Sequence, residues 1–228
     1  TTSTVFSKTG KLIPMTKADS FTGKLFTFEG SEGSGKSTQI ELLAGELEGM
    51  GHEVIVTREP GGTEIGEEIR HLLIHNSAGA DMTPEAELLL FAAARAQLVR
   101  QLIIPGLESG KIILCDRFLD STTVYQGAAR SISTDPVSYI NQFAAAAITP
   151  DLTFILDVPA EESIARVKRR VNDLPDRMEQ ENVEFYKKVR EGYLLLARSM
   201  PNRFHVVDGT RKLKVNQEDI LKTVLEHL

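Results

Sequence analysis

The sequence is poor in the features that mark secreted and membrane proteins. Its 228 residues include one cysteine, Cys115, and no tryptophan. A single cysteine excludes an intrachain disulfide, and a reducing compartment fits this composition. No apolar run approaches the roughly 18 residues that a membrane span needs, and no secretory apolar segment precedes residue 24. We therefore predict a cytoplasmic protein with no membrane association.

The sequence also has no excess of positive charge. Lysine and arginine number 26 and aspartate and glutamate 32, so the formal net charge is −6. This balance argues against a protein built to bind nucleic acid or a membrane surface, but it allows a local basic pocket for phosphates. With 41% apolar residues, the chain is long enough for one α/β domain with a sizeable core, whereas two domains would be cramped.

The first 22 residues differ from the rest in composition. Residues 1–22 are rich in serine and threonine, have no acidic residue before Asp19 and contain no arginine. A transit peptide or a loose tail would have this composition. The absence of arginine argues against the transit peptide. We expect a disordered extension over 1–22, followed by a single domain over 23–228.

A glycine-rich stretch over 24–38 organises the remainder of the chain. A short apolar strand runs into Gly-x-x-x-x-Gly-Lys-Ser, the pattern of a P-loop, and an amphipathic helix follows. Backbone N–H groups of such a loop surround a polyphosphate, and the helix dipole favours the same anion. A glycine-rich turn that binds nothing is the alternative, which the strand–loop–helix context disfavours. The expected ATP-binding residues of the loop are Gly30, Ser31, Glu32, Gly33, Ser34, Gly35, Lys36, Ser37 and Thr38.

Strand and helix patterns alternate along the chain. Strands are predicted over 25–28, 53–57, 111–115, 152–158 and 204–207, and helices after the P-loop and over about 64–74, 84–107, 135–148, 161–170, 181–199 and 215–228. This alternation predicts a P-loop domain with about five parallel strands and helices on both faces of the sheet. The active crevice should lie at the carboxyl ends of the strands.

The strand over 111–115 ends in the two charged residues Asp116 and Arg117. An acid in this position commonly positions Mg²⁺, and we expect Asp116 and the Ser37 hydroxyl to form the metal site. Transfer of a phosphoryl group to a second phosphate needs several cations, because two anionic reactants must be held together. The candidate cations are Arg70, Arg95, Arg117, Arg166, Arg170 and Arg177, whereas Lys168 and Arg169 are more typical of a solvated helix face.

Together these motifs resemble the thymidylate kinase family, from Leu25 to about Asp208. The matching segments, in the family's order, are the phosphate loop at 29–37, TREPGGT at 57–63, FAAAR at 91–95, DRF at 116–118, STTVYQG at 121–127, PDLT at 150–153 and DRME at 176–179. The resemblance implies transfer of the γ-phosphoryl group of ATP to dTMP with Mg²⁺, in a homodimer that serves dTTP biosynthesis. The 84–107 helix is the candidate dimer interface, because apolar positions appear on more than one of its faces; a helix buried in the core of a monomer has the same pattern.

The resemblance also implies roles for the residues that would hold dTMP. Phe91 would stack on thymine, and Arg95 would bind the edge of the base or orient the phosphate. Arg117 would hold the acceptor phosphate together with Arg70, and Tyr125 would lie where a ribose 2′-hydroxyl would otherwise fit. The full set of implied dTMP contacts is Glu59, Arg70, Phe91, Arg95, Arg117, Ser121, Thr122, Tyr125 and Gln126.

The segment over about 166–179 resembles the small mobile lid of this family, which brings arginines over the phosphates. One group of these kinases has a catalytic arginine within the P-loop. Here that position is Glu32, so the sequence resembles the group whose lid supplies the arginine. The implied catalytic residues are Lys36, Arg117, Arg170 and Arg177, with Arg166 on the ATP side.

Two other functions are compatible with a P-loop. Another nucleoside monophosphate or deoxynucleoside kinase would need a different acceptor pocket. A regulatory NTP-dependent switch would have no need of the acceptor-side arginines, and the chain has no Asn-Lys-x-Asp motif for reading guanine. Turnover with a panel of nucleoside monophosphates separates these hypotheses.

Overall fold

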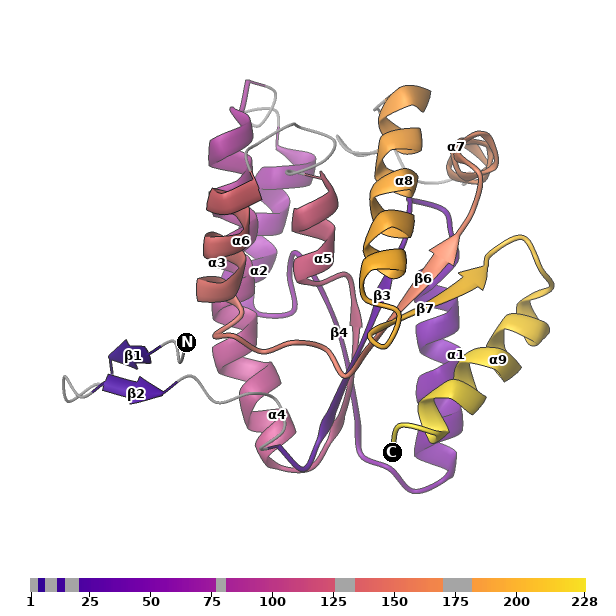
Figure 1. The fold of residues 1–228 in the computed structure, drawn as a ribbon, viewed down its shortest axis with the longest axis horizontal. Coiled ribbons are helices and arrows are strands. Elements are labelled where there is room, and N and C mark those ends of the chain that lie inside the picture. Colours follow the sequence, from indigo (N-terminus) through magenta and orange to yellow (C-terminus); the bar gives the residue numbers. More distant parts are fainter. Residues whose placement is uncertain (1–3, 7–11, 15–20, 77–80, 126–133, 170–181) are drawn as a thin grey trace.

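The computed structural model describes residues 4–6, 12–14, 21–76, 81–125, 134–169 and 182–228. Its centre is a five-stranded parallel sheet with the strand order β4-β5-β3-β6-β7 (Figure 1). These strands are β3 (Lys24–Glu29), β4 (Val54–Arg58), β5 (Ile112–Asp116), β6 (Leu152–Asp157) and β7 (Phe204–Asp208). The predicted number and direction of the strands of this sheet are confirmed.

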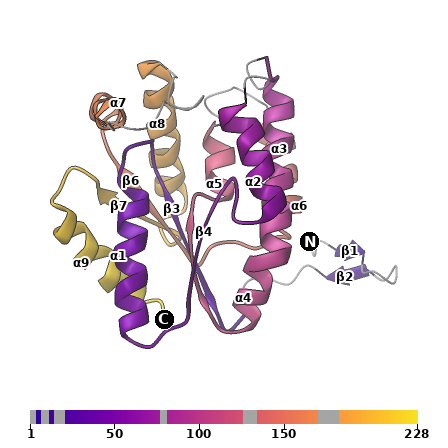
Figure 2. The ribbon, with the colours of Figure 1, turned by 180° about the vertical axis from the view of Figure 1, so that it is seen from behind.

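Helices cover both faces of the sheet. They are α1 (Lys36–Gly49), α2 (Glu64–Arg70), α3 (Pro84–Leu98), α4 (Ile104–Glu108), α5 (Leu119–Thr122), α6 (Thr134–Ala144), α7 (Ala160–Lys168), α8 (Val183–Ser199) and α9 (Leu213–Leu225), with π-helical turns η2 (His71–His75) and η4 (Val99–Ile103). Seen from behind, α1 and α9 lie on the opposite side of the sheet from α3, α6 and α8 (Figure 2).

The alternation of side chains along β3 explains the two layers. Phe26 and Phe28 point to one face and pack with the apolar residues of α1 and α9. Leu25 points to the other face, where it packs with Leu98 and Ile103 of the long helical segment. Successive side chains of a strand point to opposite faces, so a strand that is buried on both sides has a continuous apolar sequence.

The 84–107 helix differs from the single regular helix predicted. A π-helical turn, Val99–Ile103, separates α3 from α4. By length and composition, the segment Pro84–Glu108 is apolar enough to cross a membrane, whereas the sequence prediction had found no apolar run of that length. In the fold its buried residues Val99 and Leu107 pack against the sheet.

One further prediction needs correction. The helix predicted over 135–148 ends at Ala144, because Ala146 and Ala147 take left-handed backbone angles (φ 49° and 59°). Alanine is a strong helix former and gives no stop signal in the sequence. Within residues 1–22, two three-residue strands, β1 (Thr4–Phe6) and β2 (Leu12–Pro14), pair antiparallel, and the expected disordered extension stays a prediction.

Candidate active site

The P-loop joins the carboxyl end of β3 to the start of α1. Gly30, Gly33 and Gly35 have positive φ angles of 137°, 73° and 97°. A side chain at Gly30 would also meet the carbonyl oxygen of Leu156, which lies 2.6 Å from the position of a Cβ atom. Glycine is therefore required here for both backbone conformation and space. The loop places the N-terminus of α1 at the edge of a cavity.

Lys36 lies inside this loop and is 5% exposed. Its Nζ atom donates hydrogen bonds to the carbonyl oxygens of Gly30 (3.2 Å) and Ser31 (3.0 Å). Burial, reinforced by the nearby Arg117, lowers the pKa of Lys36 below its usual value. The ammonium group is thus held at the phosphate loop by backbone oxygens that an incoming phosphate can replace.

The predicted metal ligands lie together. Ser37 Oγ donates a hydrogen bond of 2.7 Å to Asp116 Oδ2. A hydroxyl and a carboxylate oxygen suit Mg²⁺, which binds few protein ligands and completes its shell with phosphate oxygens and water. Among the residues that the structure describes, no cluster of three or more His, Cys, Asp or Glu side chains could hold a metal. The donor set at Ser37 and Asp116 therefore fits a Mg²⁺ ion that is shared with a nucleotide.

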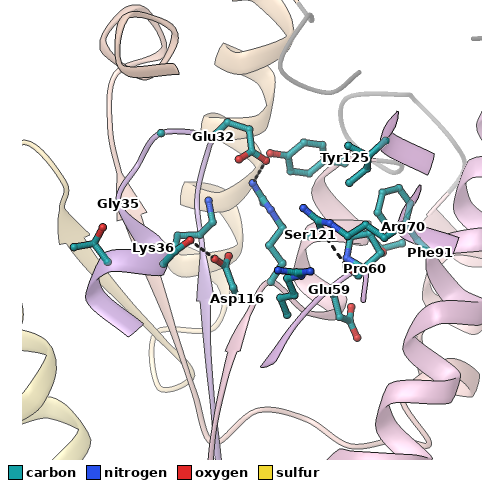
Figure 3. A pocket seen from close by; sticks show the side chains of 17 residues that line it. Glu32, Gly35, Lys36, Glu59, Pro60, Arg70, Phe91, Asp116, Ser121 and Tyr125 are labelled. Atoms are coloured by element: carbon teal, nitrogen blue, oxygen red, sulfur yellow. Dashed lines mark hydrogen bonds and ion pairs between the residues drawn. The ribbon is translucent and has the colours of Figure 1, made fainter. Parts of the chain in front are cut away.

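A cavity of about 330 Å³ connects the P-loop to the acceptor-side residues. Figure 3 shows Lys36 and Asp116 on one side of it and Phe91 and Arg70 on the other. The predicted residues on the P-loop wall are Glu32, Gly33, Gly35, Lys36, Ser37 and Thr38. Those on the opposite wall are Glu59, Arg70, Phe91, Ser121, Thr122 and Tyr125. Asp116 and Arg117 also line the cavity.

Arg117 bridges the two walls. Its Nη2 donates to Glu32 Oε1 in the P-loop at 2.5 Å, and its Nη1 donates to Ser121 Oγ at 3.2 Å. The guanidinium carbon lies 5.2 Å from the centre of the Tyr125 ring. The residue itself has a left-handed backbone, with φ 70°, which is rare for a residue with a side chain. Arg117 is thus placed between the two halves of the cavity.

Glu29, the last residue of β3, is fully buried beneath this bridge. Its Oε1 accepts from the backbone N–H groups of Phe118 (2.9 Å) and Ser121 (3.1 Å). Its Oε2 accepts from the hydroxyls of Ser121 (2.6 Å) and Tyr193 (2.7 Å). Burial raises the pKa of Glu29 above its usual value, and the charge of Arg117 opposes that rise. Sequence reasoning did not select Glu29 or Tyr193 as site residues.

Arg95 lies behind the acceptor wall and is 1% exposed. Its Nε and Nη2 lie 2.8 and 2.6 Å from Glu59 Oε2, and its Nη2 donates to Thr122 Oγ1 at 3.0 Å. Burial raises the pKa of Glu59 to about 7, and Arg95 opposes this rise. Glu59 and Thr122 line the cavity. The direct contact of Arg95 with the base or phosphate stays a prediction.

The remaining predicted residues lie on the ATP side or outside the described chain. Arg166 of α7 donates from Nη1 to the carbonyl oxygen of Gly209, at 3.1 Å, in the loop after β7. This contact joins α7 to the loop between β7 and α9. Gln126, Arg170 and Arg177 lie outside the described residues, as does the lid beyond residue 169.

Comparison with known proteins agrees with the geometry of the site. A family model described as "Thymidylate kinase" matches residues 28–220. A thymidylate kinase of Pelotomaculum thermopropionicum is 48% identical over 206 residues, which are 90% of this chain and 94% of that protein. One of Kosmotoga olearia is 45% identical over 199 residues, 87% of this chain and 94% of that protein.

The fold is also similar to a solved structure. The crystal structure of a thymidylate kinase from Ehrlichia chaffeensis has a TM-score of 0.71 and 33% sequence identity, and the match covers 89% of this chain and 98% of that one. The sequence matches extend across both walls of the cavity, from the P-loop to the elements that hold Phe91 and Arg117. The chain belongs to the thymidylate kinase family.

Proposed function

We propose that this cavity transfers the γ-phosphoryl group of ATP to the phosphate of dTMP, giving ADP and dTDP. One observation carries the proposal: a P-loop and an aromatic, polar pocket face each other across Arg117 in a single cavity. A P-loop that only hydrolysed or sensed a nucleotide would not need the second wall. The walls are built on adjacent parallel strands, because Phe28 of β3 pairs with Asp116 of β5.

The acceptor wall combines a flat apolar surface with polar groups. Phe91 offers a ring face on which thymine can stack. Ser121 and Thr122 offer hydroxyls to the nucleotide, and Tyr125 would exclude a ribose 2′-hydroxyl. Arg70, whose Nη1 donates to the carbonyl oxygen of Pro60 at 3.0 Å, lines the same cavity and would bind the acceptor phosphate.

Catalysis by this site would be mainly positioning and neutralisation of charge. Lys36 would hold the β- and γ-phosphates, and Arg117 would bind the acceptor phosphate. Ser37 and Asp116 would hold Mg²⁺, which, when bound, neutralises charge on the phosphate oxygens. Arg170 and Arg177 of the predicted lid would complete the positive surroundings. A cytoplasmic location and the absence of a nucleic-acid partner remain predictions from composition.

ADP production from Mg-ATP with a panel of nucleoside monophosphates tests this function. We expect turnover with dTMP to exceed that with purine monophosphates and dCMP by orders of magnitude. The ratio of dTMP to dUMP turnover should be smaller, because one methyl group in an apolar pocket contributes about 1–3 kcal/mol. Faster turnover of another monophosphate would assign a different kinase activity. ATP binding without transfer to any acceptor would indicate a regulatory NTP-binding protein.

We also propose that the protein is a homodimer through α2, α3 and α6, which pack together (Figure 1). These helices expose large apolar side chains: Ile65 is 56% exposed, Leu89 57%, Tyr139 81% and Phe143 68%. Exposed apolar residues on neighbouring helices are typical of an interaction surface. The prediction from sequence named only the 84–107 helix, and α6 contributes the most exposed aromatic residues of the described part of this face.

Replacing Phe143 with glutamate is expected to convert the dimer to a monomer. A carboxylate buried in an apolar interface loses its hydration, and Arg100, whose guanidinium carbon lies 5.9 Å from the centre of the Phe143 ring, would offset only part of that cost. Sedimentation velocity over a range of concentrations measures the change, and Leu195→Glu is the matched control, because Leu195 is 61% exposed on α8. A Phe143→Glu protein that remains dimeric, or a wild-type protein that is monomeric, would contradict this interface.

A further inference from the structure

Asn141 reaches the acceptor wall from α6 and is 4% exposed. Its Oδ1 accepts a hydrogen bond of 2.7 Å from Arg95 Nη1. Its Nδ2 donates to the carbonyl oxygen of Leu119, at 3.0 Å, and to Thr123 Oγ1, at 3.2 Å. One buried amide thus contacts a guanidinium from α3 and two positions at the ends of α5. The sequence motifs gave no reason to select this asparagine.

The chemistry of these partners fixes the orientation of the amide. A guanidinium has only donors, and a carbonyl has only acceptors. The opposite orientation would place the Asn141 NH₂ group against Arg95 and its oxygen against the Leu119 carbonyl, which would remove both hydrogen bonds. The two ends of the side chain therefore have separate tasks: the oxygen holds Arg95, and the nitrogen holds α5.

Both groups that Asn141 holds, Arg95 and α5, contact or include residues that line the cavity. Arg95, held by Asn141, is paired with Glu59 and bonded to Thr122, and both of these residues line the cavity. Helix α5 has only four residues, Leu119–Thr122, and its N-cap residue, Phe118, gives no side-chain hydrogen bond, so the Ser121 N–H donates to Glu29 of β3 instead. Its Ser121 and Thr122 also line the cavity. A short helix has little stability of its own, so its position depends on tertiary contacts such as those of Asn141.

We propose that Asn141 is a positioning residue for the acceptor nucleotide: its oxygen orients Arg95, which holds Glu59 and Thr122 in the cavity wall, and its nitrogen holds α5 where Ser121 and Thr122 would meet the nucleotide. This inference rests on the proposed function. It does not require Asn141 to touch the substrate, and it assigns to α6 a role inside the site as well as on the surface.

Two substitutions separate the two tasks. Asn141→Leu has a similar size and removes all three hydrogen bonds. Asn141→Asp keeps an acceptor for Arg95 but has no donor for the Leu119 carbonyl. Gln142→Leu is the matched control, because Gln142 is the exposed neighbour on the same helix. For each protein we would measure kcat, the KM values for dTMP and ATP, and the ratio of kcat/KM for dTMP to that for dCMP. Controls on each protein are the midpoint of thermal unfolding and the association state.

We expect Asn141→Leu to raise the KM for dTMP at least about tenfold and to lower the dTMP-to-dCMP ratio at least about tenfold, since each tenfold change corresponds to the loss of about one hydrogen bond to a charged or buried group. The KM for ATP should change less than about twofold. Asn141→Asp should raise the KM for dTMP but keep the dTMP-to-dCMP ratio within about threefold of wild type. Gln142→Leu should match wild type.

The outcomes separate this inference from the proposed function. A wild-type protein that does not use dTMP removes the proposed function and this inference with it. If wild type uses dTMP and Asn141→Leu behaves like Gln142→Leu, only the inference is wrong. Equal changes in the KM values for dTMP and ATP would show a general structural role and also overturn it. If Asn141→Leu does not fold, an Asn141→Asp protein with an unchanged KM for dTMP would overturn the inference instead.

Discussion

Replacement of Lys36 with methionine is expected to lower kcat by about 10²- to 10³-fold, the loss typical of removing one donor that stabilises charge in a transition state. Methionine has a similar length and no charge. In the wild-type protein the buried ammonium donates hydrogen bonds to the carbonyl oxygens of Gly30 and Ser31. Burial of a charge costs free energy that methionine avoids, so the neutral side chain should not lower the midpoint of thermal unfolding. Steady-state assays with ATP and dTMP, together with thermal unfolding, measure the two effects.

The matched control for this prediction is Lys24→Met. Lys24 lies at the other end of β3 and pairs with Asp151 at 3.1 Å, with its side chain 35% exposed. A partly exposed ion pair contributes little to stability, and Lys24 is far from the cavity along the strand. We expect nearly full activity from this variant. A Lys36→Met protein with more than a tenth of wild-type kcat would contradict the role given to Lys36.

Removal of the Arg117 side chain is expected to lower kcat/KM for dTMP by about 10²- to 10³-fold, because the guanidinium would bind the acceptor phosphate in a partly buried site. The left-handed backbone at φ 70° makes the choice of substitution informative. Glycine tolerates this conformation, whereas alanine incurs a strain of about 1–2 kcal/mol. Arg117→Gly and Arg117→Ala should therefore be equally inactive but differ in free energy of unfolding.

Steady-state kinetics and urea unfolding of both variants test this prediction. Arg198→Ala, an exposed arginine of α8, is the control for loss of a positive charge. Arg117→Lys separates charge from geometry, since an ammonium cannot form the two-pronged contact of a guanidinium. Activity of Arg117→Gly within tenfold of wild type would contradict the role of the guanidinium in phosphate binding. Equal stability of the glycine and alanine variants would contradict the expected backbone strain.

Local sequence patterns were sufficient to predict the P-loop, whose residues line one wall of the cavity. Glycine spacing predicts the P-loop because backbone conformation there depends on single residues. The meeting of Ser37 with Asp116 follows from parallel strands that end at the same edge of a sheet. The family resemblance then placed Phe91 and Tyr125 on the opposite wall, and both line the cavity.

Little in the sequence indicates the buried polar contacts behind the cavity walls. Tyr193 lies 164 residues from Glu29 along the chain, and Asn141 lies 46 residues from Arg95. No periodicity links residues so far apart, and an asparagine or tyrosine in an amphipathic helix is compatible with many surroundings. Arg95 itself illustrates the difficulty: the resemblance assigned it to the bound dTMP together with Phe91, but the structure places Phe91 in the cavity wall and the Arg95 guanidinium behind it.

The pairing of β3 with β5 has a consequence for the reaction geometry. Thr27 pairs with Cys115 and Phe28 with Asp116, and the backbone N–H of Arg117 donates to the carbonyl oxygen of Phe28 at 2.9 Å. The P-loop and Arg117, which would hold the donor and the acceptor phosphate, thus follow paired residues of two neighbouring strands, which lie about 4.8 Å apart. The paired strands would therefore set the distance between the two phosphates. Shifts in the surrounding helices would change the affinity for each nucleotide more than the alignment of the reacting atoms.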